Sequence, residues 1–286
     1  MPEPPLDPRP LLFASDSITE GYYELEAAEK SETMQALSTH REEVYLWYAG
    51  LTLYRRGLLS RWSFLGNDDR LRAWNLQGQL LGLGVSSAKV GLDTLLAGYY
   101  SMSFAATRHL LETCAQIDYL ERFPDEAPLW HGEAGGRAKR SAKLSSNELA
   151  SYEPAGMYQL LLPLEDNDQD RVKRNQLYRS WKLMCKGAHP SGEGVRQTES
   201  VDQNALIFGP TYHPELCSAG FDHGLFSVLE AIKRLHVIQN QSEEWQEDVV
   251  RLRHSLQEWR KRQQTNFDPD GQWIGPGPIA RIDGPV

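Results

Sequence analysis

The segment from Arg171 to His189 holds the residues best suited to chemistry. On a regular helix, at 100° per residue, five of its side chains fall within about 40° of one line. These five are Arg171, Arg174, Tyr178, Lys182 and Cys185. His189 continues the line if one further turn forms past Gly187. Arginine and lysine bind phosphate groups and histidine transfers protons near neutral pH, so His189, Arg174 and Lys182 are the candidates for catalysis.

The same segment has a plainer interpretation as a solvated basic flank. Its apolar stripe must face the core, and the stripe consists of Leu177, Trp181, Met184 and Ala188. Charged side chains beside such a stripe usually extend into water. Both interpretations predict one amphipathic helix over residues 167–186, which Gly187 and Pro190 end.

A second polar group precedes this segment. Arg108 and Glu112 are four residues apart and therefore share one face of a helix. That face also holds Tyr119 and adjoins Leu111, so the pair should border the apolar stripe. A structural ion pair at the core edge is one explanation, because buried charges are usually paired. The other is a binding site between helices, in which Arg108, Glu112 and Tyr119 contact a ligand together with Tyr178.

Histidines and cysteines elsewhere raise the question of a metal or a nucleophile. His213, Cys217 and His223 match no common zinc-site spacing, and a fourth ligand is unassigned. Cys185 and His189 are four residues apart, as a thiolate pair could be, although a cysteine so near a core stripe is usually inert packing. No common nucleotide- or zinc-binding motif occurs. We therefore expect no metal and no cofactor.

Apolar side chains at helical spacing predict an all-α fold. The strongest pattern runs from Ser86 to Arg122, where Pro124 stops it, and a helix of that length crosses a whole domain. Further helices are predicted as two stretches within 17–57 and over 67–83, 134–150, 167–186, 220–240 and 242–264. Residues 205–212 are the one strand candidate. The expected architecture is a helical bundle around one long central helix.

Both ends of the chain are expected to be irregular. Prolines crowd residues 1–15, which predicts an extended arm. Prolines and glycines punctuate residues 265–286 too densely for regular structure, which predicts a tail that is disordered or lies on the surface, with a short partner-binding strand as the alternative. A single helical domain over residues 16–264 lies between them.

Composition and charge narrow the functional classes. The chain has 286 residues and a formal net charge of −9, so it repels phosphate at long range and does not suit a nucleic-acid coat. Three widely spaced cysteines form a poor disulfide framework and indicate a reducing compartment. No signal peptide and no apolar run of membrane-span length is evident. We expect a cytoplasmic protein with no membrane association.

The motifs described above also carry a family resemblance. Arg108-His-Leu-Leu-Glu112 with Tyr119-Leu120, followed by Tyr178 and the turn from Ala188 to Ser191, resembles a group of uncharacterised bacterial helical proteins. That group is similar to the HEPN superfamily of helical bundles, which includes RNA-cleaving toxins and antiphage factors. The resemblance covers about residues 90–240. It departs from the HEPN ribonuclease pattern, in which four to six residues lie between an arginine and a following histidine. Only Lys182, with six residues between it and His189, imitates that spacing, and lysine lacks the planar fork of arginine.

The resemblance therefore implies a HEPN-like bundle. Two main alternatives for its function remain. One is a non-catalytic binding or scaffold protein with an unidentified protein partner. The other is a HEPN-like ribonuclease or nucleotide-handling enzyme for RNA or nucleotides, with His189 as the proton-transfer group and Arg174, Arg179 or Lys182 stabilising phosphate charge. A homodimer is implied as well, because HEPN-type sites usually form across a two-fold interface. A metal-dependent enzyme is a more distant third.

Overall fold

The computed structural model describes residues 15–59, 69–127, 157–188, 210, 212–238, 242–263, 265–267 and 273–276. Its elements are α2 (Ser15–Thr39), α3 (Arg41–Leu59), α4 (Asp69–Leu96), α5 (Tyr100–Arg122), η1 (Pro124–Glu126), α9 (Met157–Leu161), α10 (Gln169–Arg174), α11 (Gln176–Ala188), α13 (Pro214–Ile238), α14 (Glu243–Gln263), β1 (Thr265–Phe267) and β2 (Trp273–Pro276). Helices account for most of the described residues, so the predicted all-α class is confirmed. Within these ranges, no helix combines the length and the apolar character that a membrane crossing requires.

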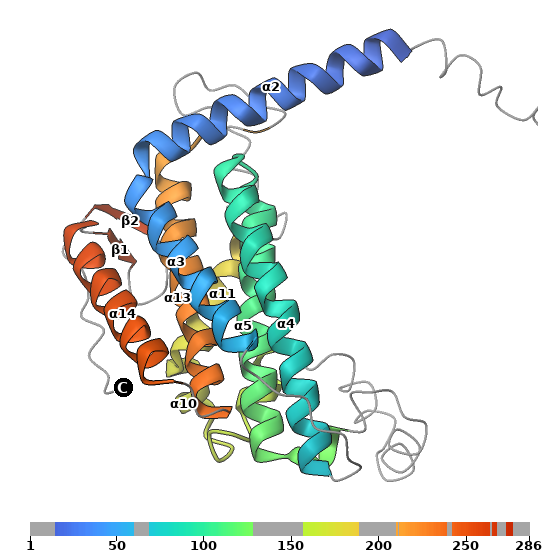
Figure 1. Ribbon diagram of the computed structural model, residues 1–286, viewed down its shortest axis with the longest axis vertical. Coiled ribbons are helices and arrows are strands. Elements are labelled where there is room, and N and C mark those ends of the chain that lie inside the picture. Colours follow the sequence, from blue (N-terminus) through green and yellow to red (C-terminus); the bar gives the residue numbers. More distant parts are fainter. Residues whose placement is uncertain are drawn as a thin grey trace, which may run out of the picture.

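Four helices, α3, α4, α5 and α13, form the centre of the bundle (Figure 1). α11 packs on the outer side of α5, and α14 packs against α3 and α13. α2 crosses the end of the bundle and projects beyond it (Figure 1). α5 contacts α4, α9, α11 and α13, and α13 contacts α3, α4, α5 and α14.

In the core, large aromatic side chains pack against residues with little or no side chain. Trp47 and Phe221 are fully buried with their rings edge to face, and their centroids lie 5.9 Å apart. Trp47 also lies directly over Gly224, where an added Cβ would come within 1.8 Å of the indole. α3 and α13 can therefore approach closely only because residue 224 has no side chain.

The single long helix predicted from Ser86 to Arg122 is wrong, because the chain reverses at residues 97–99. Gly98 has a φ of 81°, which favours glycine. The Gly98 N–H donates to the Leu95 carbonyl at 3.2 Å, and the Tyr99 N–H donates to the Thr94 carbonyl at 2.8 Å. These two bonds form a Schellman motif, which satisfies the last carbonyls of α4. The apolar spacing continues on both sides of the turn and gave no sign of it.

The helix predicted over residues 167–186 is also divided, at Asn175. The backbone of Asn175 is extended, with φ −60° and ψ 128°, and its N–H still donates to the Arg171 carbonyl at 2.9 Å. Its side-chain oxygen accepts the N–H of Leu177 at 2.9 Å and so caps the start of α11. One asparagine thus ends α10 and begins α11.

α11 continues through Gly187, which was expected to end it. A Cβ at position 187 would lie 2.2 Å from the Phe104 ring, so the glycine allows α11 to pack closely against α5. Packing, and not helix termination, explains this residue.

The structure describes part of the C-terminal tail and almost none of the predicted N-terminal arm, so only the tail can be compared with its prediction. In the tail, β1 and β2 pair antiparallel, with Thr265 opposite Pro276 and Phe267 opposite Trp273. The expectation of an entirely irregular tail is therefore corrected over these two strands. The predicted arm, apart from residue 15, the predicted helix at 134–150 and most of the strand candidate at 205–212 lie outside the described residues.

Two glycines of α4 and its turn provide a test of this turn. Gly98→Ala should lower the free energy of unfolding by about 1 kcal/mol, because a Cβ disfavours positive φ. Gly82→Ala should raise it by about 0.5–1 kcal/mol, because the new Cβ meets only Leu58 Cδ2, at 4.0 Å, and alanine favours the helix. Urea denaturation followed by circular dichroism measures both. Equal effects of the two substitutions on the free energy of unfolding would contradict a positive φ at Gly98.

Candidate functional site

The pair Arg108–Glu112 lies at the edge of the core between α5 and α11. Arg108 Nε and Glu112 Oε1 are 3.6 Å apart, and the two side chains are 27% and 28% exposed. The Trp181 indole N–H donates to the same Glu112 oxygen at 2.7 Å. The carboxylate therefore joins an arginine of its own helix to a tryptophan of α11, and this fixes α11 on α5.

Aromatic rings extend this contact along α11. Tyr178 stacks on Trp181, with ring centroids 5.8 Å apart and planes at 26°. Tyr158 of α9 meets Tyr178 edge to face at 5.9 Å. We call Arg108, Glu112, Tyr158, Tyr178 and Trp181 the α5–α11 cluster. It brings together three of the four predicted binding residues.

The fourth, Tyr119, lies elsewhere. Its hydroxyl donates to Glu126 Oε2 at 2.9 Å, and its ring packs on Phe123 with centroids 4.8 Å apart. Tyr119 thus ties the end of α5 to η1. It shares the face of Arg108 and Glu112 on α5, and its side chain contacts Glu126 and Phe123.

Cys185 borders the α5–α11 cluster. Burial raises the pKa of its thiol above the ordinary value, and the nearby Arg108 only partly opposes this rise. The thiol is therefore protonated near neutral pH, whereas a nucleophilic cysteine needs a lowered pKa. This finding favours the packing role over the thiolate pair with His189, which lies outside the described residues.

The predicted line of basic groups does not persist through Asn175. Arg171 and Arg174 belong to α10, whereas Lys182 belongs to α11. Arg171 pairs with Glu165 at 3.4 Å, and Arg174 is exposed. Since the chain bends at Asn175, the line expected for one regular helix is corrected.

A different basic line lies along α11 itself. Arg179, Lys182 and Lys186 follow one another at spacings of three and four residues, so they share one face. The buried residues Leu177 and Met184 lie on the opposite face. Arg179 and Lys182 are exposed and Lys186 is half-buried, and α11 contains no acidic residue. We call these three residues the α11 basic stripe; the spacing alone could have revealed it.

A buried charge network was missed by the sequence analysis. Arg234 of α13 is 9% exposed and donates to Asp118 Oδ2 at 2.5 Å, to Glu230 Oε2 at 2.8 Å and to the Cys114 carbonyl at 3.2 Å. Burial raises the pKa of Asp118 despite Arg234, whereas at Glu230 the effect of burial is outweighed by Arg234 and Lys233, which hold its pKa below the ordinary value. The network ties α5 to α13.

A second buried group closes the junction of α2 and α3. His40 Nε2 lies 2.9 Å from the Tyr212 hydroxyl, and His40 Nδ1 lies 3.5 Å from Glu43 Oε1. His40 and Glu43 are each 5% exposed. Burial disfavours ionisation of Glu43, but the hydrogen bonds from His40 and from the backbone N–H of Glu43 more than offset it, so the pKa of Glu43 is lowered. This group joins the start of α3 to the residues before α13.

The histidines and cysteine near residue 215 serve packing contacts. The His213 backbone N–H donates to the Tyr100 hydroxyl at 2.7 Å, and burial raises the pKa of Cys217. Over the part of the chain that the structure describes, no three histidine, cysteine, aspartate or glutamate side chains are grouped so that they could hold a metal ion.

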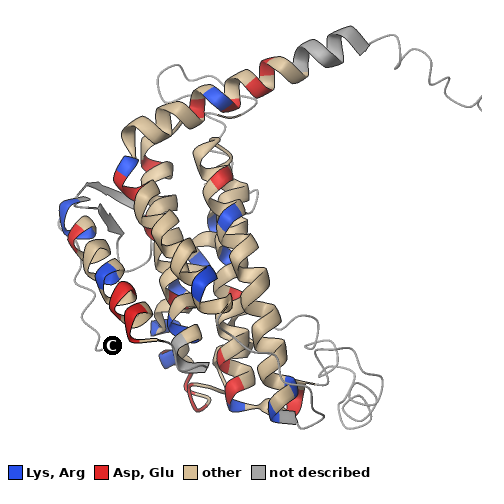
Figure 2. Cartoon of the chain, in the orientation of Figure 1, with Lys and Arg blue, Asp and Glu red and all other residues tan. Residues whose placement is uncertain are grey.

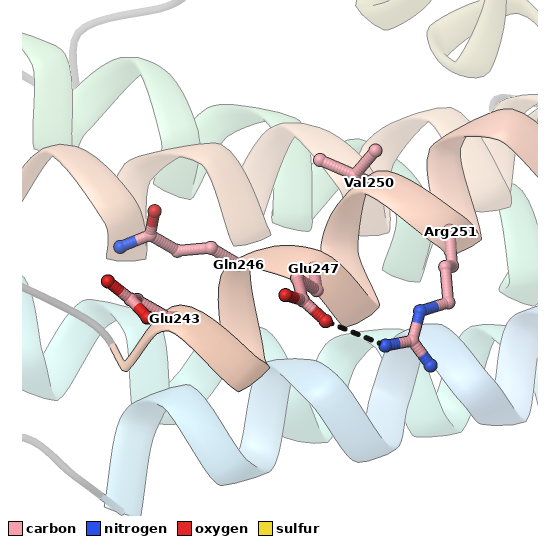
Figure 3. A pocket seen from close by; sticks show the side chains of 5 residues that line it. All are labelled: Glu243, Gln246, Glu247, Val250 and Arg251. Carbon is pink, nitrogen blue, oxygen red and sulfur yellow. Dashed lines mark hydrogen bonds and ion pairs between the residues drawn. The ribbon is translucent and has the colours of Figure 1, made fainter.

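A shallow depression of about 530 Å³ lies on α14 (Figure 3). Its lining residues are Glu243, Gln246, Glu247, Val250 and Arg251. Glu247 and Arg251 pair with each other at 3.0 Å across it. Because this depression is open and lined by one helix, the α5–α11 cluster with its basic stripe is the better candidate site.

Comparison of the chain with protein-family models, with curated proteins and with solved structures finds no match.

The three cysteines give a test of the site chemistry. In the folded protein, iodoacetamide should label Cys185 and spare Cys114 and Cys217, which are fully buried. Burial raises the pKa of Cys114 to about 12, so even a rare encounter finds a thiol. Labelling sites are read by peptide mass spectrometry, with concentrated urea as the control in which all three react.

The pH dependence distinguishes packing from nucleophilic chemistry at Cys185. Because its pKa is raised, the labelling rate should climb steadily between about pH 7 and pH 9. A rate that is already level at pH 7 would reveal a thiolate and restore the nucleophile.

Proposed function

We propose that this protein is a non-catalytic binding protein with a HEPN-like helical bundle, and that the outer face of α11 is its docking surface. One observation carries the proposal. Glu112 already engages Arg108 and Trp181, so the α5–α11 cluster serves to hold α11 in place. The same helix presents the α11 basic stripe on the face away from the core.

The chemistry of this face indicates an acidic partner. Arg179, Lys182 and Lys186 lie on a chain of net charge −9, so they form a local positive surface on an acidic molecule. The half-buried rings of Tyr178 and Trp181 lie between this stripe and the core. Aromatic and basic side chains together bind partners that offer both carboxylates and apolar groups.

An acidic protein segment suits this face better than RNA does. The overall negative charge opposes the long-range approach of a polyanion, whereas a short segment needs only the local stripe. The competing function is a ribonuclease, in which His189, the residue after α11, acts with Lys182 and Arg174.

Charge reversal tests the docking surface. Lys182→Glu should weaken binding of a fluorescein-labelled Glu–Tyr peptide about tenfold, or about 1.4 kcal/mol, because it places a carboxylate in the stripe. Lys261→Glu reverses an exposed lysine at the end of α14 and should leave binding unchanged. Fluorescence anisotropy gives both dissociation constants, and binding should fall as salt rises. Equal dissociation constants for the two variants would contradict the proposal.

A nuclease assay distinguishes the binding function from the ribonuclease. Wild type and His189→Ala are incubated with a labelled single-stranded RNA, and the products are separated on a gel. The proposal expects no difference between them. Cleavage by wild type that His189→Ala abolishes would replace the binding function by the ribonuclease.

A further inference from the structure

α2 extends well beyond the bundle that it joins (Figure 1). Of its described side chains, Ala36 alone is buried. The Tyr99 hydroxyl donates to Glu29 Oε1 at 2.7 Å, so this side of α2 faces the body. The half of α2 before Glu29 lacks the tertiary packing from which most helices gain their stability.

The opposite side of α2 carries an exposed stripe. Tyr23, Ala27, Lys30 and Met34 follow at spacings of four, three and four residues, so they share one face. Met34 lies about 160° around the helix from the buried Ala36. All four side chains are exposed, Tyr23 by 62% and Met34 by 66%. We call these four residues the α2 outer stripe.

The α2 outer stripe is suited to an apolar occupant. Acidic and uncharged residues make up most of the described part of α2 (Figure 2). Lys30, the basic residue of the stripe, pairs with Glu26 at 3.0 Å. The exposed ring of Tyr23 meets that of Tyr22 edge to face, with centroids 5.9 Å apart. Because the charge is paired and the rings are exposed, apolar contacts are what this face offers.

The sequence directly before α2 provides such an occupant. Pro2, Pro5 and Pro8 recur at every third residue of the predicted arm. A polyproline II helix has three residues per turn, so the three rings share one face, which spans about 19 Å from Pro2 to Pro8. The α2 outer stripe spans about 17 Å from Tyr23 to Met34. The two faces therefore match in length.

The connection is long enough for the arm to fold back along α2. Pro8 lies seven residues before Ser15, where α2 begins. An extended chain spans up to about 23 Å over that distance. Tyr23 lies about 12 Å along α2 from Ser15, so Pro8 can reach the level of Tyr23 with length to spare for the reversal. The short tether also keeps the arm at a high effective concentration, which favours it over a free partner segment.

We propose that the arm folds back as a polyproline II helix and packs Pro2, Pro5 and Pro8 on the α2 outer stripe of the same chain. Proline-rich segments bind aromatic surfaces in this form, because the helix is preformed and loses little entropy on binding. Pro8 lies against Tyr23 and Pro2 against Met34. The arm gives the projecting half of α2 the packing that the bundle does not supply. This contact is independent of the docking surface on α11.

Hydrogen–deuterium exchange on the full-length chain tests the contact with two matched pairs of substitutions. Pro5→Ser with Pro8→Ser removes two rings from the packing face and should speed amide exchange over residues 22–34 at least about fivefold, because α2 then opens more often. Pro4→Ser with Pro10→Ser removes as many prolines from another face of the same polyproline II helix and should leave that exchange unchanged. Circular dichroism confirms that each variant is folded.

A photo-crosslinker identifies the occupant of the stripe. p-Benzoylphenylalanine in place of Ala27 should cross-link to residues 1–10 within one chain. The same group in place of Ala28, about 100° around the helix, should not. Equal exchange in wild type and in Pro5→Ser with Pro8→Ser, or equal acceleration by both pairs, would overturn the proposal. A cross-link that joins two chains, seen as a doubled mass on a denaturing gel, or no cross-link to residues 1–10 would overturn it as well.

Discussion

The guanidinium of Arg234 is buried where α13 passes α5, and this charge constrains the bundle. A buried arginine must be paired, because removing one of its partners leaves an uncompensated charge in the interior. Asp118 and the Cys114 carbonyl provide that pairing from α5, and Glu230 provides it from α13. α5 is thereby fixed in position, and α11 in turn rests on α5 through Glu112.

This order of dependence explains which features the sequence could predict. The apolar spacing of α5 and α13 predicts helices, because periodicity is local and the core face repeats along it. Gly98 and Asn175 divided two predicted helices, because a cap depends on one backbone angle or one side-chain bond and leaves the periodicity unchanged. The pair Asp118–Arg234 lies far apart in sequence, so only the folded chain brings it together.

The candidate site was also predicted only in part, because spacing along one helix is local and contacts between helices are not. Arg108 and Glu112 lie on one helix, so spacing alone placed them together at the core edge. Their link to Trp181 joins two helices and needed the packing of α11 on α5. The basic line was assigned to the wrong residues because Asn175 changes the direction of the chain. The line that remains, Arg179, Lys182 and Lys186, belongs to α11 alone.

The turn at Gly98 is also in contact with α2. Tyr99, the residue after the glycine, holds Glu29, and Tyr100 accepts the N–H of His213. From Ala36 to Ser15, α2 is a rigid rod of roughly 30 Å at 1.5 Å per residue. A tilt of only about 10° at its base would move the far end by about 5 Å, on this helix geometry. Any change in the direction of α2 where it meets the bundle would therefore be largest at its far end.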